Sequence, residues 1–352
     1  MDVIALLTEA TEISATDLFI VAGLPLSYKI NGIIQEKDQE KLPPTQTEEI
    51  IRNIYELANQ RNFSEFLKKG DDDFSFSIKG VSRFRICTYK QRGSLAAVVR
   101  VIAFNLPKPE DLGIPEAVIN LTNYSKGMIL VTGPAGSGKS TTLACMIDYI
   151  NSERRNHIIT LEDPLEHLHT HKKSIVSQRE ISTDTESYVT ALRAALRQSP
   201  DVILLGEMRD YETINISMTA AETGHLILST LHTIGAANTI DRVIDVFPPN
   251  QQNQIAMQLS MVLDAVVSQQ LIPDVNGKQI PVFEIMTVTP AIRNMIREGK
   301  VHQINGMIYS CSGENMISMD ASLFNLYKEG GITKKTALHY ATNPDMLSKK
   351  LG

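Results

Sequence analysis

A glycine-rich run near the middle of the chain has the composition of a phosphate-binding loop. It reads Gly133, Pro134, Ala135, Gly136, Ser137, Gly138, Lys139 and Ser140, and it follows a strand predicted at residues 128–132. Its glycines let backbone N–H groups close around phosphate oxygens, and the helix N-terminus that follows adds favourable positive potential. Lys139 is expected to reach the β- and γ-phosphates, while Ser140 holds Mg²⁺. The helix that follows opens through Thr141, which we also predict to bind the nucleotide. Together, the run and this helix predict a site for ATP and Mg²⁺.

Two further apolar runs are each followed by a carboxylate. Glu162 follows residues 158–161, and Glu207 follows residues 202–205 and Gly206. The carboxyl ends of parallel strands meet at one edge of a sheet, where nucleotide phosphates bind in such folds, so both acids are expected beside the loop. Glu162 is the predicted general base for the attacking water, and Glu207 is the predicted Mg²⁺ ligand.

The neighbours of these two acids each have two interpretations. Asp163 either contacts Mg²⁺ through water or caps the turn before Pro164. Arg209 either forms a structural ion pair or touches a phosphate group. The sequence leaves both choices open.

A buried strand predicted at residues 226–230 is bracketed by two histidines, His225 and His232. His232 follows the strand, so it is expected at the same edge of the sheet as Lys139 and Glu207. A neutral imidazole there can hydrogen-bond to the γ-phosphate and relay its loss to a neighbouring element. We predict His232 as this catalytic sensor, with a satisfied core histidine as the alternative.

An arginine that would neutralise the transferring phosphoryl group is not evident in this part of the chain. Four arginines lie instead on or between strand-like runs of the first hundred residues: Arg83, Arg85, Arg92 and Arg100. An arginine supplied across an interface raises hydrolysis rates by orders of magnitude. We predict Arg83 and Arg85 as catalytic charge stabilisers and Arg100 as a nucleotide contact, with ordinary surface arginines as the alternative.

Two domains are expected to carry these residues. Residues 1–105 mix a helical pattern at 45–60 with strand-like runs, which predicts a small α+β domain. The strand-like runs are residues 18–21, 26–30 and 82–89. A proline-punctuated segment at residues 106–115 can continue neither a helix nor a strand, and it is the predicted linker.

From residue 116 to residue 352 the pattern changes to buried strands that alternate with helices. This alternation is typical of a parallel α/β sheet with helices on its faces. The apolar spacing is helical from about Gln251 to Gln270 and again beyond Ala291, so the larger domain is predicted to end in a helical subregion.

Composition narrows the class of protein. The 352 residues carry a net charge of −6, with no Trp and few aromatic residues, which disfavours a nucleic-acid partner. Three scattered cysteines build neither a disulfide framework nor a zinc cluster. The chain shows neither a basic leader before an apolar run nor an apolar stretch of the roughly 18 residues that span a membrane. It is therefore expected in the cytoplasm.

Together these motifs resemble those of the secretion ATPase superfamily of ring motors, and within it those of the PilT-like type IV pilus retraction ATPases. The resemblance spans nearly the whole chain. It is carried by residues 15–18, 22–25 and 83–85, the phosphate loop, an Asp box at 161–164, a Walker B motif at 206–210, a His box at 224–233 and a helical motif of retraction motors at 291–298.

This resemblance implies a PAS-like N-terminal domain, a RecA-like C-terminal domain and a homohexamer that binds ATP between the two domains of each subunit. It also implies that the ring docks at the inner face of the cell membrane, on a PilC-like platform protein and the pilus base. Within the site, Glu162 would activate water, Glu207 would serve the Mg²⁺ site and His232 would act as sensor. ATP turnover would then move one domain against the other and remove pilin subunits from the filament.

Other motors share parts of this pattern. Pilus-extension and type II secretion ATPases usually carry a further N-terminal domain and a tetracysteine zinc site, whereas this chain begins at the PAS-like domain. A PilU-like accessory retraction motor shares most of the motifs. A RecA-like nucleic-acid translocase would be expected to show basic and aromatic channel residues. A nucleotide sensor without hydrolysis is opposed by the intact Lys139, Glu162 and Glu207.

Overall fold

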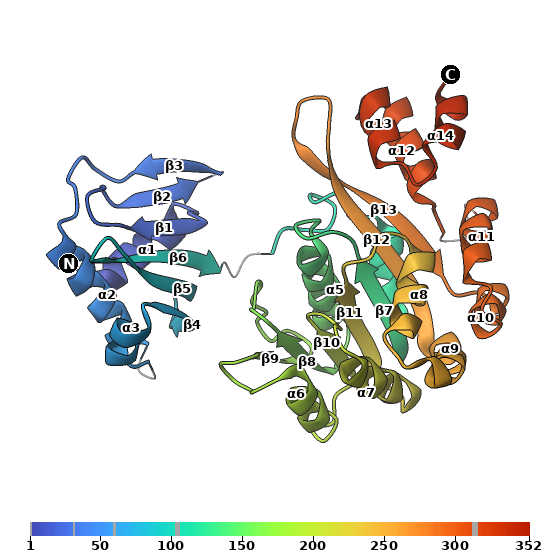
Figure 1. Ribbon diagram of the computed structural model, residues 1–352, viewed down its shortest axis with the longest axis horizontal. Helices are drawn as coiled ribbons and strands as arrows, with labels where there is room; N and C mark the ends of the chain where they lie inside the picture. Colours follow the sequence, from blue (N-terminus) through green and yellow to red (C-terminus); the bar gives the residue numbers. More distant parts are fainter. Residues whose placement is uncertain (1, 31, 59–60, 103–105, 312–315) are drawn as a thin grey trace. The chain divides into compact units, whose positions relative to one another are not determined.

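Separate hydrophobic cores divide the chain into two units. The computed structural model describes residues 2–30, 32–58, 61–102, 106–311 and 316–352. The first unit comprises Met1–Asn105 with Glu166–Leu168, and the second comprises Leu106–Leu165 and His169–Gly352 (Figure 1). Within the described ranges, each helix is too short or too polar to cross a lipid bilayer.

The first unit is an antiparallel sheet packed against helices. Its six strands lie in the order β3-β2-β1-β6-β5-β4. The strands are β1 (Asp17–Ile20), β2 (Ser27–Ile30), β3 (Ile33–Glu36), β4 (Asp71–Ile78), β5 (Ser82–Gln91) and β6 (Ser94–Ile102). The helices are α1 (Val3–Glu12), α2 (Pro44–Leu57) and α3 (Phe63–Lys69). The predicted strands at 18–21, 26–30 and 82–89 are confirmed as β1, β2 and β5.

Helix α2 shows why this unit folds as predicted. Ile50, Ile51 and Ile54 are fully buried, since their spacing puts them on one side of the helix, against the sheet. The helix ends at Leu57, and Gln60, the last residue of the predicted helix, lies outside the described residues.

The second unit is built on a seven-stranded sheet in the order β13-β12-β7-β11-β10-β8-β9. Neighbouring strands are parallel except for β12 and β13, which are antiparallel. The strands are β7 (Gly127–Thr132), β8 (His157–Glu162), β9 (Ile175–Glu180), β10 (Val202–Leu205), β11 (Leu226–Leu231), β12 (Leu263–Pro273) and β13 (Gln279–Thr287). The four predicted strands are confirmed as β7, β8, β10 and β11.

Both faces of this sheet are covered by helices, as the side-chain alternation along β7 shows. Met128 and Leu130 join the core under one set of helices, whereas Ile129 and Val131 join the core under another. The first set comprises α6 (Tyr188–Ala195), α7 (Tyr211–Glu222), α8 (Ala236–Asp245), α9 (Pro249–Val262), α10 (Pro290–Arg297) and α11 (Ile304–Ser310). The second comprises α4 (Glu116–Asn120) and α5 (Lys139–Glu153), with the 3-10 turn Leu121–Asn123 beside them.

The end of the chain is helical, as predicted beyond Ala291. After α11 follow α12 (Met319–Lys328), α13 (Lys334–Tyr340) and α14 (Pro344–Leu351), which share an apolar cluster with the β12–β13 hairpin. The 3-10 turn Val301–Gln303 joins α10 to α11. The helical motif of residues 291–298 corresponds to α10, whose buried side chains are Ile292 and Ile296.

One predicted element is wrong. Residues 251–270 were expected to form a helix, but α9 ends at Val262 and residues 263–273 form β12. This strand lies between β7 and β13 and is buried on both faces, so its residues do not alternate in polarity. A strand without this alternation has no periodicity that separates it from a helix.

The proline-punctuated residues 106–115 form turns, with neither helix nor strand. Ile114 is buried in the same apolar cluster as Leu143 and Met146 of α5. The segment therefore belongs to the second unit and packs beside the helix that follows the phosphate loop.

Candidate active site

The predicted site residues of the second unit meet at the carboxyl edge of its sheet. In register, Leu231 lies opposite Thr132, and Leu205 lies opposite both Ser229 and Leu161. The backbone bonds continue past the strand ends, where the Gly133 N–H donates to Leu231 O over 3.3 Å and the Gly206 N–H donates to Leu161 O over 2.8 Å. The structure thus brings together the phosphate loop and the residues that follow β8, β10 and β11.

The loop needs its glycines for two physical reasons. Gly133, Gly136 and Gly138 have φ values of 143°, 74° and 85°, which residues with a side chain rarely adopt. A Cβ at Gly133 would collide with the carbonyl oxygen of Gln269, and a Cβ at Gly138 would lie 2.9 Å from Gln269 Nε2. Backbone N–H groups at the start of α5 can therefore approach a ligand closely, as phosphate binding requires.

Lys139 and Ser137 are both buried within the loop. Lys139 Nζ donates to the carbonyl oxygens of Gly133 and Pro134, both over 2.8 Å, and the residue is only 8% exposed. Ser137 Oγ is buried, and the described residues offer it no hydrogen-bond partner. A buried hydroxyl without a partner is costly, and phosphate oxygens are stronger acceptors than neutral carbonyls, so the loop fits a phosphate group.

Glu207 is the centre of a small charged group after β10. Its Oε1 lies 2.6 Å from Arg209 Nε, and its Oε2 lies 3.3 Å from His232 Nε2. The Glu207 side chain is 14% exposed, against 76% for Arg209 and 55% for His232. The carboxylate raises the pKa of the Arg209 guanidinium through this hydrogen bond. Arg209 is thus ion-paired with Glu207 in this structure.

The two histidines that flank β11 have different surroundings. His225 Nδ1 lies 2.8 Å from the carbonyl oxygen of Ala220, at the end of α7, where β11 begins. His232 lies at the other end of the strand, beside Glu207. Only the second position matches the predicted sensor.

Glu162 ends β8 in register with Glu180, which ends β9. The Ile181 N–H donates to Glu162 O over 2.8 Å, which fixes the backbone at this point. Glu180 is 5% exposed and accepts from Thr183 Oγ1 over 3.2 Å. The two carboxylates therefore lie on neighbouring strands, with Glu162 nearer the centre of the sheet.

Tyr188, the first residue of α6, is a further residue at this edge. A Cβ at Gly206 would lie 2.8 Å from the Tyr188 hydroxyl, so this glycine makes room for the phenol. Burial raises the pKa of Tyr188, and the nearby carboxylates of Glu207, Asp163 and Glu162 raise it further. The hydroxyl is therefore a protonated donor among the acids of the edge. No motif in the sequence marks it.

Gln269 was missed by the sequence analysis, because residues 263–270 were assigned to a helix. It lies on β12, where its Oε1 accepts from Thr142 Oγ1 over 2.7 Å. Its amide and its carbonyl oxygen also lie against Gly138 and Gly133. Gln269 thus holds the loop and the first turn of α5 to the sheet.

A cavity of about 580 Å³ adjoins the first turn of α5, a volume within the range of small-ligand pockets. Gly138, Thr141 and Thr142 form one wall. The other walls come from residues 110–114 and from the β12–β13 hairpin, including Leu271 and Ile280. The cavity is mainly apolar and directly beside the phosphate loop.

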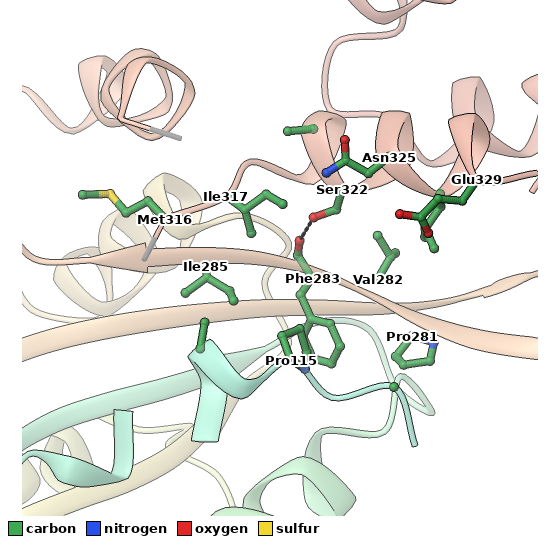
Figure 2. Close-up of a pocket in the computed structure, with 14 residues that line it drawn as sticks. Pro115, Pro281, Val282, Phe283, Ile285, Met316, Ile317, Ser322, Asn325 and Glu329 are labelled. Atoms are coloured by element: carbon green, nitrogen blue, oxygen red, sulfur yellow. Dashed lines mark hydrogen bonds between the residues drawn. The ribbon is translucent and has the colours of Figure 1, made fainter. Parts of the chain in front are cut away.

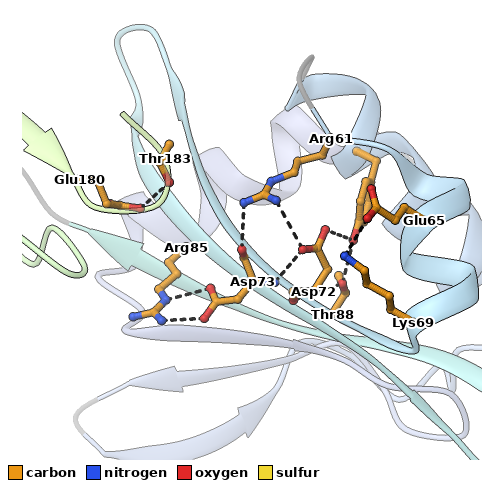
Figure 3. A network of polar contacts seen from close by, with 10 residues as sticks. Arg61, Glu65, Lys69, Asp72, Asp73, Arg85, Thr88, Glu180 and Thr183 are labelled. Atoms are coloured by element: carbon orange, nitrogen blue, oxygen red, sulfur yellow. Dashed lines mark hydrogen bonds and ion pairs between the residues drawn. The ribbon is translucent and has the colours of Figure 1, made fainter. Parts of the chain in front are cut away.

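Two of the predicted arginines, Arg85 and Arg100, are held in place by acids of the first unit. Arg85 makes a bidentate pair with Asp73, with Nε to Oδ1 at 2.9 Å and NH2 to Oδ2 at 2.6 Å (Figure 3). Arg100 Nε lies 3.1 Å from Asp17 Oδ1, and its side chain is 65% exposed. Arg83 lies on β5, in register with Ile102.

Arg92 lies in the turn between β5 and β6, with a φ of 47°. Among the four arginines, Arg85 and Arg100 face each other in register on neighbouring strands. The two form a pair of cations, each balanced by its own aspartate.

Known proteins are similar to this chain over nearly its whole length. The family model described as "Type II/IV secretion system protein" matches residues 2–319. The chain is 43% identical over 345 residues to the type IV pilus retraction ATPase PilT of Pseudomonas aeruginosa, which covers 98% of this chain and 99% of that relative. It is 39% identical over 350 residues to the type IV pilus ATPase PilU of the same organism, which covers 99% and 91%.

A solved structure is similar over the same length. The crystal structure of the pilus retraction motor PilT with bound ADP superposes with a TM-score of 0.90 at 43% identity, and the match covers 99% of each chain. The similarity therefore includes both sheets.

Proposed function

Because the chain belongs to the type II/IV secretion system protein family, we propose that it is an ATP-hydrolysing motor that drives type IV pilus retraction. The observation that carries the proposal is the phosphate loop, with Lys139 and a partnerless Ser137 hydroxyl among the described residues, beside Glu162 and Glu207. The full-length similarity to the retraction ATPase PilT supports pilus retraction as the process that this motor drives.

In this proposal the second unit is a RecA-like ATPase domain over residues 116–352, and the first is a PAS-like domain over residues 1–105. Residues 106–115 join them. The parallel sheet with helices on both faces and the antiparallel sheet with helices packed against it support these assignments. The similarity to the ADP-bound motor over both units supports them further.

We assign nucleotide binding to the phosphate loop, the cavity beside it and the acid after β10. The backbone of residues 133–138, with Lys139 and Thr141, would hold the phosphates, and the cavity of about 580 Å³ would take the nucleoside. Ser140 and Glu207 carry the oxygen ligands that Mg²⁺ prefers, so they would hold the ion. When bound, Mg²⁺ neutralises phosphate charge.

Hydrolysis needs a base, a donor and a sensor at the same edge. Glu162 would orient and deprotonate the attacking water, as a positioned carboxylate can. The Tyr188 hydroxyl, kept protonated by burial, would donate a hydrogen bond within the acid cluster. His232, partnered with Glu207 in this structure, would exchange that partner for the γ-phosphate and so register its loss.

The arginines Arg83, Arg85 and Arg100 would supply positive charge to the transferring phosphoryl group. Arg85 and Arg100 would leave Asp73 and Asp17 to do so. Such exchange is inexpensive for Arg85, because its exposed ion pair with Asp73 contributes at most about 1 kcal/mol. It would cost more for Arg100, because the Asp17 carboxylate is buried and would lose this partner. Hydrolysis would then depend on the position of the first unit, because that unit carries the arginines.

We further propose that the chain works as a homohexamer in the cytoplasm, docked at the inner face of the cell membrane. Its partners would be a PilC-like platform protein and the pilus base. Support for this assembly comes from the family and from the retraction motors that the chain resembles over nearly its whole length.

Deleting the gene and counting surface pili tests the direction of force. A retraction motor predicts cells with excess pili that do not twitch, because filaments are still made but not withdrawn. Loss of pili would instead identify an extension motor and defeat the proposal. Complementation with a Lys139→Ala copy should leave the deletion phenotype unchanged.

A PilU-like accessory motor is the second candidate, favoured by the 39% identity over 350 residues. The same deletion separates the two motors. An accessory motor leaves residual twitching driven by another retraction ATPase, whereas the main motor leaves none.

A further inference from the structure

A buried carboxylate on β13 joins the starts of two helices that are far apart in the sequence. Glu284 is 4% exposed. It accepts a hydrogen bond from the N–H of Ala236, the first residue of α8, over 2.9 Å, and another from the N–H of Met319, the first residue of α12, over 3.4 Å. Each helix N-terminus carries partial positive charge, which favours an anion at this point.

Burial raises the pKa of Glu284, while the two backbone donors act in the opposite direction. A buried acid is expensive to keep, so its retention calls for a physical reason. Hydrophobic packing could join α8 and α12 to β13 without it. What the carboxylate adds is a directional link, because its two oxygens hold the two helix starts at once.

The α8 side of this link reaches the nucleotide edge. Helix α8 begins shortly after His232, and Thr239 of α8 has its Oγ1 2.7 Å from Thr233 Oγ1, the residue next to His232. The Gly235 N–H donates to Ser268 Oγ over 2.9 Å, next to the Gln269 that holds the phosphate loop. A shift of the His232 loop therefore acts on the start of α8.

The α12 side reaches the last helices. Asp320, next to Met319, accepts from the N–H groups of Thr342 over 2.7 Å and Asn343 over 3.0 Å, just before α14. The core of α12 to α14 contains Leu323, Ala337 and Leu347, one from each helix. These three helices thus form one packed group whose start is held by Glu284.

We propose that Glu284 is a positioning residue that couples the nucleotide-sensing loop of His232 to the C-terminal helices α12 to α14. The proposal rests on the proposed function, since it assumes that ATP is bound and hydrolysed at the phosphate loop. When the loop moves with loss of the γ-phosphate, α8 moves with it. Then α12 must follow, or a buried N–H and a carboxylate oxygen lose their partners, which is costly.

A second contact of α12 provides a matched control. Ser322 Oγ donates to the carbonyl oxygen of Phe283 over 2.6 Å, which also fixes α12 to β13 (Figure 2). This bond joins α12 to β13 and involves no residue of α8. Ser322→Ala therefore loosens α12 without cutting the link, whereas Glu284→Gln keeps the side-chain shape but replaces one acceptor oxygen with an N–H₂ donor.

Hydrogen–deuterium exchange of the full-length protein, with ADP or with a non-hydrolysable ATP analogue, tests the coupling. In the unmodified protein and in Ser322→Ala, exchange at residues 316–324 should differ between the two nucleotides by about five-fold or more. In Glu284→Gln the difference should vanish at residues 316–324 and persist at residues 233–240. Phosphate release should continue in Glu284→Gln.

Two results would overturn the coupling. One is a nucleotide-dependent difference at residues 316–324 that is the same in Glu284→Gln as in the unmodified protein. The other is found in the unmodified protein, if exchange at residues 133–142 depends on the nucleotide but exchange at residues 316–324 does not. This second result does not require the variant to fold. If residues 133–142 respond to neither nucleotide, the proposed function fails, and the coupling fails with it.

Discussion

The charged groups of the two units differ in what they already hold. In the second unit, Lys139 rests on neutral backbone carbonyls, and the Ser137 hydroxyl has no partner among the described residues. In the first unit, Arg85 and Arg100 are each neutralised by an aspartate. The Ser137 hydroxyl of the loop is open to an acceptor, whereas Arg85 and Arg100 must each first leave an aspartate. The difference suggests that binding belongs to the second unit and that control of hydrolysis belongs to the first.

The largest expected effect in the second unit is the loss of the general base. Glu162→Gln keeps the side-chain volume but cannot take a proton, so kcat for ATP hydrolysis should fall by about 10³. ATP binding should be retained, because in this proposal the phosphates are held by the loop and not by Glu162. Glu153→Gln, at the far end of α5, is the control and should leave kcat unchanged. Equal rates for both variants would remove Glu162 from the mechanism.

In the first unit, the largest effect on ATP hydrolysis is expected from a change at Arg85. Arg85→Ala should lower kcat by about 10², less than the 10³ or more of a lone arginine finger, because Arg83 and Arg100 are candidates for the same role. Arg52→Ala is the matched control, since Arg52 also forms an exposed ion pair, with Glu48 at 2.9 Å on α2. If steady-state phosphate release is the same in the two variants, Arg85 has only a structural role. The first unit would then not control hydrolysis through this residue.

Freeing the same arginine should have a smaller effect in the opposite direction. Asp73→Asn removes the charge that holds Arg85, so Arg85 no longer needs to exchange partners. Because an exposed pair of this kind contributes at most about 1 kcal/mol, kcat should rise by no more than about five-fold. A fall in kcat would mean that Asp73 positions Arg85 for its role and does not restrain it.

The smallest expected effect concerns a carboxylate of the second unit that lies away from the loop. Burial raises the pKa of Asp264 to about 6, although Arg293 and Lys126 partly offset it. The folded protein therefore holds a proton between pH about 4 and 6 that the unfolded chain has released, so stability falls as the pH rises through this window.

Asp264→Asn should lose this pH dependence. At pH 7 the variant should be more stable than the unmodified protein by about 1 kcal/mol, after allowance for solvent screening, and its ATPase activity should be unchanged. Thermal unfolding at several pH values between 4 and 8 measures the difference. Parallel stability curves for the two proteins would show that Asp264 is not buried as an acid.

Features that depend on a local sequence pattern could be predicted from the sequence. The phosphate loop, the strands β7, β8, β10 and β11, and the acids that follow two of them could be placed because buried parallel strands and glycine loops have their own composition. Strand β12 was misread because a strand buried on both faces has no alternation, and Gln269 was lost with it.

Features that depend on contacts between distant residues could not be predicted from the sequence. Tyr188 reaches the acids only because Gly206 lacks a Cβ, and Glu284 meets two helix starts only in the folded chain. The pairing of Arg85 with Asp73 is set by the register of β4 and β5, which nothing in the composition of either strand specifies.

The central claim is that the loop of residues 133–140 binds and hydrolyses ATP. Phosphate release by the purified protein and by Lys139→Ala, measured side by side at saturating ATP with matched unfolding temperatures, tests it most directly. We predict steady release from the unmodified protein and release at the background level from Lys139→Ala. Equal release from the two proteins would contradict the claim.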